Sequence, residues 1–201
     1  MHNVVIIGAG GHAKVIADIV IKSKDRLLGF LDDNKVGTVF QDYSVIGKVA
    51  DVKKFADENC FIIGIGSNAV REKIANSLNA RWYTAIHPSA QISLGATVGE
   101  GSTVMAGAII NADSKIGRHS IVNTRASVDH DCFVSDFAHI SPAATLCGTV
   151  FVGERTHIGA GTTVKNNISI CSDVTVGCGA AVVKNIDSAG TYVGTPAKKL
   201  R

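Results

Sequence analysis

Several features that define common protein classes are scarce or missing in this sequence. Aromatic residues make up only 5% of the chain, and the formal net charge of +3 comes from basic residues that are scattered along it. A surface for nucleic acid or for an anionic membrane needs a concentrated basic patch, so we expect neither partner. The longest apolar run near the start, from Val15 to Ile21, is interrupted by Asp18 and is too short to span a bilayer.

The cysteines lack the spacing of a structural metal site. They are odd in number and form no CxxC pair: Cys60, Cys132, Cys147, Cys171 and Cys178. This pattern favours free thiols in a reducing compartment and argues against a structural zinc. The chain opens on the strand-like run from Val4 to Ile7 and shows no secretory signal. We therefore expect a cytoplasmic protein.

An aliphatic residue occupies every sixth position from Ile86 to Val182 without exception. A period of six fits neither a 3.6-residue helix nor a simple hairpin meander. It is typical of a hexapeptide β-solenoid, in which short strands wrap a narrow prism and each repeat is stabilised by its neighbours. The positions are Ile86, Ile92, Val98, Val104, Ile110, Ile116, Val122, Val128, Val134, Ile140, Leu146, Val152, Ile158, Val164, Ile170, Val176 and Val182.

The residue two positions before each aliphatic residue is usually small, as at Ala90, Ser102 and Ala126. Because side chains alternate along a strand, this residue also points into the prism, where space is limited. The low aromatic content suits an interior that cannot hold rings. A chance run of short strands would have to keep this phase over the whole segment, so we exclude it.

The first part of the chain has a different pattern. Apolar runs at 4–7, 27–31 and 61–65 alternate with helical patterns at 13–22 and about 69–78. Strands that alternate with helices predict a small parallel βαβαβ sheet, that is, a Rossmann-like α/β domain.

The change of pattern predicts two domains. We expect the α/β domain at residues 1–82 and the β-helix domain at 83–201, with the segment from Trp82 to Pro88 as the link. The period fails after Val182, and Tyr192 to Lys199 is expected to be an ordered loop with a basic end.

A glycine-rich turn follows the first strand. Gly8, Gly10 and Ala13 match the G-x-G-x-x-G/A fingerprint, and the acidic pair Asp32 and Asp33 follows about twenty residues later. The domain is about half the size of a dinucleotide-binding fold. This favours a single mononucleotide unit, whose backbone N–H groups would bind the phosphates of a nucleotide diphosphate. An NAD site and a purely structural turn are the alternatives.

The domain order and five short motifs resemble one known family. The motifs are Gly8–His12, Phe30–Asp33, Ile65–Asn68, Val128–Cys132 and Gly194–Ala197. Over its whole length the chain resembles the hexapeptide-repeat sugar acetyltransferases of the sialic-acid and bacillosamine type. This resemblance implies a left-handed parallel β-helix of five to six coils with three hexapeptides per coil. It also implies a homotrimer that uses acetyl-CoA as co-substrate.

The resemblance further implies transfer of an acetyl group to the amino group of a UDP-linked 4-amino-4,6-dideoxy sugar in bacterial glycan biosynthesis. O-acetylation of sialic acid or a related sugar is the alternative. His130 would be the general base and Asp131 the carboxylate that raises its basicity, at a position where the bacillosamine-type enzyme has Glu. The nucleotide sugar would bind at Gly10, Gly11, His12, Asp32, Asp33 and Gly66, and acetyl-CoA at His139 and at the backbone of Ala160 and Cys178.

The other histidines have weaker claims to a role in the reaction. His87 precedes a proline in the link and is expected to be structural, and His119 lies at a repeat corner with a solvated or interface role. His157 follows His139 by three hexapeptides, so on the template it lies above it and can line the cofactor groove.

Two other functions compete with acetyl transfer. A zinc lyase of the carbonic-anhydrase type uses a similar β-helix, but it pairs two histidines five residues apart, and no such pair exists here. We therefore expect no metal. A non-enzymatic scaffold that binds nucleotide sugars would not need the Asp129–Asp131 cluster around His130.

The spacing of His130 and His139 predicts an oligomer. Nine residues are half of an 18-residue coil, so the two side chains lie on different sides of one prism, on the order of 15 Å or more apart. If both act in one reaction, they must come from neighbouring subunits, as in a cyclic trimer of prisms.

Overall fold

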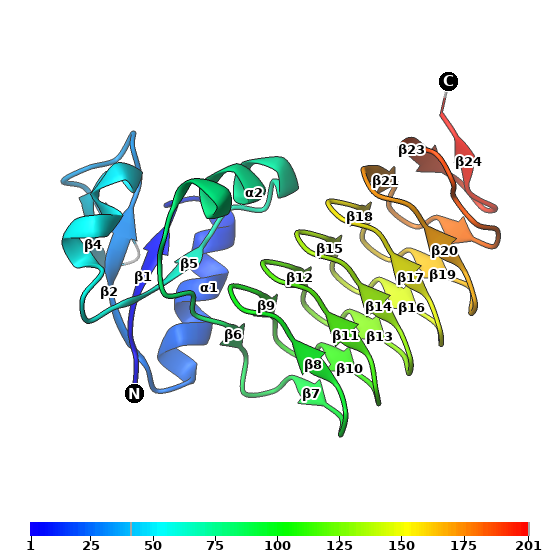
Figure 1. Cartoon of the computed structure of the whole chain (residues 1–201), viewed down its shortest axis with the longest axis horizontal. Coiled ribbons are helices and arrows are strands. Elements are labelled where there is room, and N and C mark those ends of the chain that lie inside the picture. Colours follow the sequence, from blue (N-terminus) through cyan, green and yellow to red (C-terminus); the bar gives the residue numbers. More distant parts are fainter. Residues whose placement is uncertain (41, 201) are drawn as a thin grey trace.

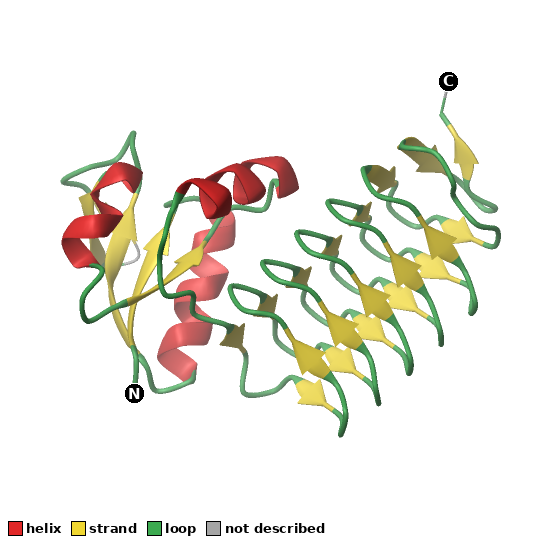
Figure 2. Cartoon of the chain, viewed as in Figure 1, coloured by secondary structure: helices red, strands yellow, loops and turns green. Residues whose placement is uncertain are grey.

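A computed structural model describes residues 1–40 and 42–200. A small α/β domain at the N-terminus leads directly into a long parallel β-helix that ends near the C-terminus (Figure 1). Colouring by secondary structure separates the two parts, because both α-helices lie in the first and the second consists of short strands and turns (Figure 2).

The α/β domain is built on one five-stranded sheet in the order β3-β4-β2-β1-β5, parallel except for the β3–β4 pair. The predicted strands and helices are all present. Two features were not predicted, the pair of strands β3 and β4 and a 3₁₀ helix, because these segments lack a regular apolar period. The elements are β1 (Asn3–Ile7), α1 (Gly11–Lys22), β2 (Arg26–Leu31), β3 (Val39–Phe40), β4 (Tyr43–Gly47), the 3₁₀ helix η1 (Val49–Phe55), β5 (Cys60–Ile63) and α2 (Asn68–Ser77).

The β-helix has three sheets, one on each side of the prism, and they are parallel except for the pair β23–β24. The β7 sheet contains β7 (Gln91–Ile92), β10 (Ile109–Ile110), β13 (Ser127–Val128), β16 (Thr145–Leu146), β19 (Thr163–Val164) and β22 (Ala181–Val182). The β8 sheet contains β8 (Thr97–Val98), β11 (Lys115–Ile116), β14 (Phe133–Val134), β17 (Phe151–Val152) and β20 (Ser169–Ile170). The β6 sheet contains β6 (Ala85–Ile86), β9 (Thr103–Val104), β12 (Ile121–Val122), β15 (His139–Ile140), β18 (His157–Ile158), β21 (Val174–Val176), β23 (Gly190–Val193) and β24 (Lys198–Lys199).

The predicted inward positions form the core of the β-helix. From Val104 onward the aliphatic residues of the period are buried. Ile86 and Ile92, in the first coil, remain 36% and 37% exposed because no coil lies below them. Each strand pairs with the strand 18 residues later, as His139 pairs with His157, so the predicted coil length is confirmed.

The small inward residues have a hydrogen-bonding role as well as a packing role. The hydroxyl of Ser102 donates to the carbonyl of Gly117 at 2.7 Å and accepts from the backbone N–H of Ser120 at 2.9 Å. Thr156 repeats this pattern three coils further on, with Cys171 and Val174 as its partners. These hydroxyls are buried but satisfied, so they add little of the free-energy cost of a buried polar group.

The ends of the β-helix differ from the prediction. The tail expected to be a loop instead contains β23 and β24, an antiparallel pair that extends the β6 sheet. The segment expected to be a link already pairs with both domains, because Trp82 bridges to Phe61 and Ala85 belongs to β6.

One apolar core joins the two domains. Helix α1 and the sheet of the α/β domain share a single buried cluster with Tyr83, Ala85, Met105 and Ile121, which lie on the outer side of the β6 sheet or lead into it. The α/β domain therefore covers the first coils on this side of the prism, and outward-facing residues there are buried.

Candidate active site

The glycine turn between β1 and α1 forms the floor of a cavity of about 270 Å³. Gly8 has φ of +100°, a conformation that favours glycine, and Gly10 is the N-cap of α1. A Cβ atom at Gly10 or Gly11 would meet no protein atom within 4 Å. The space in front of both residues is thus open to a ligand. The cavity is lined by Gly8, Ala9, Gly10, Gly11, His12, Asp32, Gly64, Ile65 and Gly66.

The two predicted acidic residues have different positions. Asp32 lines this cavity, and its carboxylate accepts hydrogen bonds from the backbone N–H groups of Ala9 and Asn34 at 2.9 and 3.0 Å. Asp33 is not among the cavity residues, and its carboxylate accepts from the backbone N–H of Val49. Asp32 therefore shapes the glycine turn, while Asp33 fixes the start of η1.

His130 and Asp131 form a close pair at the turn between β13 and β14. The Nδ1 atom of His130 lies 2.7 Å from Oδ2 of Asp131, and both side chains are more than half exposed. Asp131 has φ of +57°, which Asp tolerates better than most residues. Next to the pair, Asp129 accepts hydrogen bonds from the backbone N–H of His130 and the amide of Asn111. The turn is thus held by side chains from two coils.

The hydrogen bond to Asp131 and the charge of Asp129 raise the pKa of His130 above its ordinary value of 6.5. The Cε1 and Nε2 atoms of the ring lie against Gly148, one coil further on, where an added Cβ atom would be 2.6 Å from both. Gly148 therefore makes room for this orientation of the ring. The 18-residue spacing between His130 and Gly148, one coil length, is the sequence signal for this contact.

His139 lies on the outer side of the β6 sheet, where the α/β domain covers it to 8% exposure. Its ring stacks on that of His157 with centroids 4.7 Å apart, and its Nε2 lies 3.0 Å from the Asn123 amide nitrogen. The ring of His12, from α1, is 6.4 Å away. Among the described residues, Nδ1 of His139 and Nε2 of His12 have no hydrogen-bond partner. Three histidines from both domains are therefore brought together here.

Burial keeps these imidazoles neutral. It lowers the pKa of His139 to about 3, with contributions from His157 and Arg71, and it lowers the pKa of His12 to about 4, with a contribution from Arg71. The pKa of His157 is lowered by the same two causes, burial and Arg71. At neutral pH these rings can donate and accept hydrogen bonds without carrying charge.

A second cavity, of about 550 Å³, lies beside His139 between the α/β domain and the β-helix. Gly66 lines both this cavity and the one at the glycine turn. The predicted nucleotide-sugar site and the predicted acetyl-CoA contact therefore adjoin each other at this residue. The lining residues are Gly66, Ser67, Asn68, Ala69, His139, Arg155, His157, Asp173 and Thr175.

The remaining predicted residues are separate from this cavity. Ala160 lies at a corner, where its carbonyl accepts a hydrogen bond from Gly179, and Cys178 is exposed beside it on the next coil. His119 is buried at the domain boundary, with its ring stacked on Phe137. His87 accepts hydrogen bonds from Ser89 in the first turn of the β-helix.

The described part of the chain contains neither disulfides nor a clustered set of metal ligands. All five cysteines are free thiols. Within residues 1–40 and 42–200, no group of three or more His, Cys, Asp or Glu side chains is arranged to hold a metal ion, and neither α-helix has the length and apolarity needed to cross a membrane.

Comparison with known sequences gives a family for the first domain and two curated relatives. A family model described as the PglD N-terminal domain matches residues 3–78. The UDP-N-acetylbacillosamine N-acetyltransferase of Bacillus subtilis is 41% identical over 114 residues, covering 53% of this chain and 52% of that protein. An uncharacterized mimivirus protein, L142, is 38% identical over 113 residues, which are 56% of this chain and 23% of that protein. The chain thus matches about half of the length of the first of these relatives and about a quarter of the length of the second.

Solved structures match over the full length. The acetyltransferase domain of PglB from Neisseria gonorrhoeae is 36% identical, with coverage of 100% of both chains and a TM-score of 0.94. PerB from Caulobacter crescentus, in complex with CoA and GDP-perosamine, is 35% identical, with coverage of 100% of this chain and 98% of its own and a TM-score of 0.94. The PglB domain has also been solved with acetyl coenzyme A.

The chain combines a glycine-turn α/β domain with stacked six-residue repeats, and solved structures match it along its whole length. These features define a hexapeptide-repeat transferase with a left-handed parallel β-helix. Within that class, the chain belongs to the hexapeptide-repeat sugar N-acetyltransferases, the family of the PglB domain and PerB. The expected family and fold class are confirmed.

Proposed function

We propose that the chain transfers an acetyl group from acetyl-CoA to the amino group of a UDP-linked 4-amino-4,6-dideoxy sugar. The observation that carries this proposal is the pair of cavities that share Gly66, one at a phosphate-binding turn and one beside His139. PerB binds CoA and GDP-perosamine together. The name of the Bacillus relative supports a UDP-linked acceptor.

The proposed roles follow the positions of the side chains. The nucleotide sugar occupies the cavity at Gly10, Gly11, His12, Asp32 and Gly66, and Asp33 acts only through η1. Acetyl-CoA contacts His139 and the backbone of Ala160 and Cys178. His130 is the general base.

The chemistry needs a proton acceptor next to the attacking amine. With Nδ1–H of His130 donated to Asp131, Nε2 is free to accept a proton. The amine nitrogen attacks the thioester carbonyl, a C–N bond forms and the C–S bond breaks. The imidazolium then returns its proton to the thiolate of CoA. General-base assistance of this kind typically contributes about 10²- to 10⁴-fold.

The proposal includes a homotrimer with the active site between subunits. His130 follows the β7 sheet, whereas His139 lies on the β6 sheet, a different side of the prism. In one subunit the two side chains therefore face different directions. A three-fold ring places the His130 side of one prism next to the His139 side of its neighbour.

The acceptor can be tested directly by measuring thiol release from acetyl-CoA. We propose a panel of UDP-linked 4-amino-4,6-dideoxy sugars, a GDP-linked 4-amino sugar and free sialic acids. Turnover is expected with the UDP-linked amino sugars. Turnover with sialic acids alone would replace this proposal by O-acetylation, and nucleotide-sugar binding without any turnover would replace it by a non-enzymatic role.

Gly11→Val is expected to weaken nucleotide-sugar binding by about tenfold or more while leaving acetyl-CoA binding unchanged. A side chain here enters the open space in front of the turn and meets no protein atom, so it obstructs the ligand and not the fold. Calorimetric titration of the variant with UDP and with CoA measures both affinities. Loss of CoA binding with normal UDP binding would show that the two sites are reversed.

Asp131→Asn is expected to shift the acid limb of the pH–rate profile to lower pH. His130 acts in its neutral form, so activity rises as pH passes through the pKa of His130, and the carboxylate of Asp131 is the largest cause that raises this pKa. Removing the carboxylate lowers the pKa and makes the base weaker, so the plateau rate also falls. An unchanged acid limb would mean that another group controls it. Asp113→Asn, at the equivalent corner one coil earlier, is the matched control.

A further inference from the structure

Arg71, in the first turn of α2, is 1% exposed and is the largest fully buried side chain of the chain's described part. On the α/β side, its Nη1 donates to the carbonyls of Ile65 and Gly66, each at 3.1 Å. Its Nη2 donates to the side-chain oxygen of Asn68 at 2.8 Å. The guanidinium thus holds the loop between β5 and α2 from inside.

The same guanidinium reaches across the domain boundary. Its Nε donates to the carbonyl of His119 at 2.6 Å, and its Nη2 donates to the carbonyls of Phe137 and Ala138 at 2.8 and 3.4 Å. His119 and Phe137 occupy equivalent corners of successive coils, both with positive φ. Arg71 therefore joins one loop of the first domain to two coils of the β-helix.

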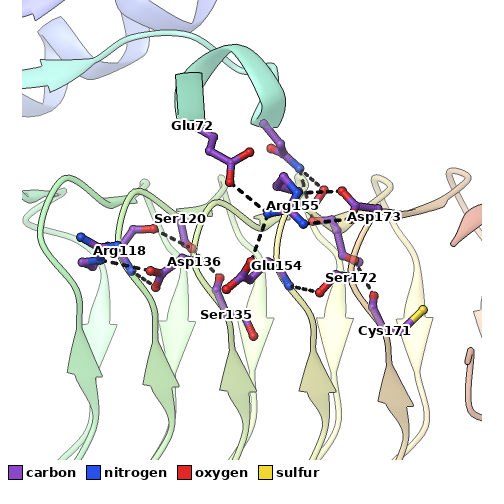
Figure 3. Close-up of polar contacts among 12 residues, drawn as sticks. Glu72, Arg118, Ser120, Ser135, Asp136, Glu154, Arg155, Cys171, Ser172 and Asp173 are labelled. Carbon is purple, nitrogen blue, oxygen red and sulfur yellow. Dashed lines mark hydrogen bonds and ion pairs between the residues drawn. The ribbon is translucent and has the colours of Figure 1, made fainter. Parts of the chain in front are cut away.

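Two neighbours of Arg71 extend this contact to a third coil. The Asn68 amide donates to the carbonyl of Arg155, the equivalent corner one coil further on, at 2.8 Å. Figure 3 shows Glu72 extending from α2 toward Arg155, and the two side chains form an ion pair at 3.0 Å. The start of α2 is consequently fixed along three stacked corners.

The partners of Arg71 among the described residues are oxygen atoms of neutral groups, mostly backbone carbonyls. A buried cation without a carboxylate carries a desolvation cost that hydrogen bonds to carbonyls offset only in part, so stability alone is a weak reason for an arginine at this position. The planar fork of arginine, however, can bind several carbonyls in fixed directions at once. The contacts of Arg71 are therefore suited to fixing the relative positions of the backbone segments that it binds.

The groups that Arg71 connects belong to the two halves of the proposed site. Gly66 lines both cavities, and Ala138 directly precedes His139. We propose that Arg71 is a positioning residue for acetyl transfer: it fixes the Gly66 loop against the coil that carries His139, and so sets the distance between acceptor and thioester. This inference rests on the proposed function, since its kinetic effect requires a transfer reaction.

The test compares Arg71→Met and Arg71→Lys with Lys73→Met, a change at an exposed residue of the same helix. Both Arg71 variants are expected to lower kcat by about 10- to 100-fold, because a misplacement of about 1 Å can cost 10²-fold in rate. Lysine keeps the charge but cannot span both sets of carbonyls, so it should not rescue kcat. Dissociation constants for UDP and CoA are expected to stay within about threefold of wild type.

A second measurement tests these contacts directly and requires no turnover. We use the term clamp for Arg71 and Asn68 together with the corner carbonyls that they bind. Amide hydrogen exchange at residues 64–72 and 118–139 should be faster in the Arg71 variants and unchanged in Lys73→Met. Asn68→Ala, which keeps Arg71, should show the same changes to a smaller extent, and it serves if the Arg71 variants do not fold.

Three outcomes overturn the inference. The first is a normal kcat of the Arg71 variants below their melting temperature, even if their Tm is lower. The second is a loss of UDP or CoA binding that accounts for the lost rate. The third is unchanged amide exchange in Arg71→Met, Arg71→Lys and Asn68→Ala. A wild-type protein that transfers no acetyl group from the acceptor panel would instead refute the proposed function. The exchange measurement would still decide whether Arg71 fixes the two domains together.

Discussion

Replacing His130 by alanine is expected to lower turnover by about 10²-fold or more while leaving nucleotide-sugar affinity nearly unchanged. His130 belongs to the β-helix and its Nε2 is free to accept a proton, whereas the cavity at the glycine turn belongs to the other domain. Steady-state kinetics and calorimetric titration of the variant with UDP measure the two quantities.

Asn166→Ala is a suitable control for this experiment. Asn166 is exposed and occupies the same position of the repeat two coils beyond His130, so its replacement tests the effect of changing this corner. Turnover of His130→Ala within a few-fold of this control would remove His130 from the mechanism.

Mixed trimers of two inactive variants are expected to recover roughly a quarter of wild-type activity. One variant is His130→Ala, and the other is His139→Trp, which should obstruct the thioester. In each mixed trimer, one of the interfaces combines an intact His130 with an intact His139. Random assembly of a symmetric ring therefore leaves roughly a quarter of all interfaces with both native histidines. The two proteins are unfolded together in equal amounts and refolded, and mixed trimers are identified by mass.

The burial of His139 requires a second version of this experiment. The side chain is 8% exposed and stacked on His157, so tryptophan can disturb the domain boundary as well as the cofactor. Ala160→Trp, at a half-buried corner, obstructs the predicted cofactor contact without entering that boundary. No recovery with either partner, despite confirmed mixed trimers, would mean that the site lies within one subunit.

The repeat made most of the β-helix predictable. A period of six defines which side chain points inward at every position, and the stack of His139 on His157 follows from the coil length alone. The strands β3 and β4 carry no such period: β3 has only two residues and lies at the edge of the sheet, and β4 mixes polar and apolar residues. The sequence therefore predicted the long element better than the small domain.

The candidate site was predicted less completely because it depends on how the domains pack. Nothing in the local pattern around His139 indicates that the α/β domain covers it, or that His12 lies 6.4 Å from it. Arg71 was missed for the same reason. The sequence pattern of the helix does not distinguish Arg71 from the other charged residues. Its burial becomes apparent only when α2 packs against the coil corners at His119 and Phe137.

The three-corner contact of α2 restricts how such a chain can change its length. A β-helix grows by whole coils, and each coil is supported mainly by its neighbours, so an added coil should in general be tolerated. An 18-residue duplication between His119 and Arg155, however, would move one corner out of reach of Arg71 or Asn68. The same duplication placed after Val182 would leave the clamp and the proposed catalytic residues where they are. We therefore expect proteins that carry this clamp to gain coils on the C-terminal side of Arg155, and their variation in size to be concentrated there.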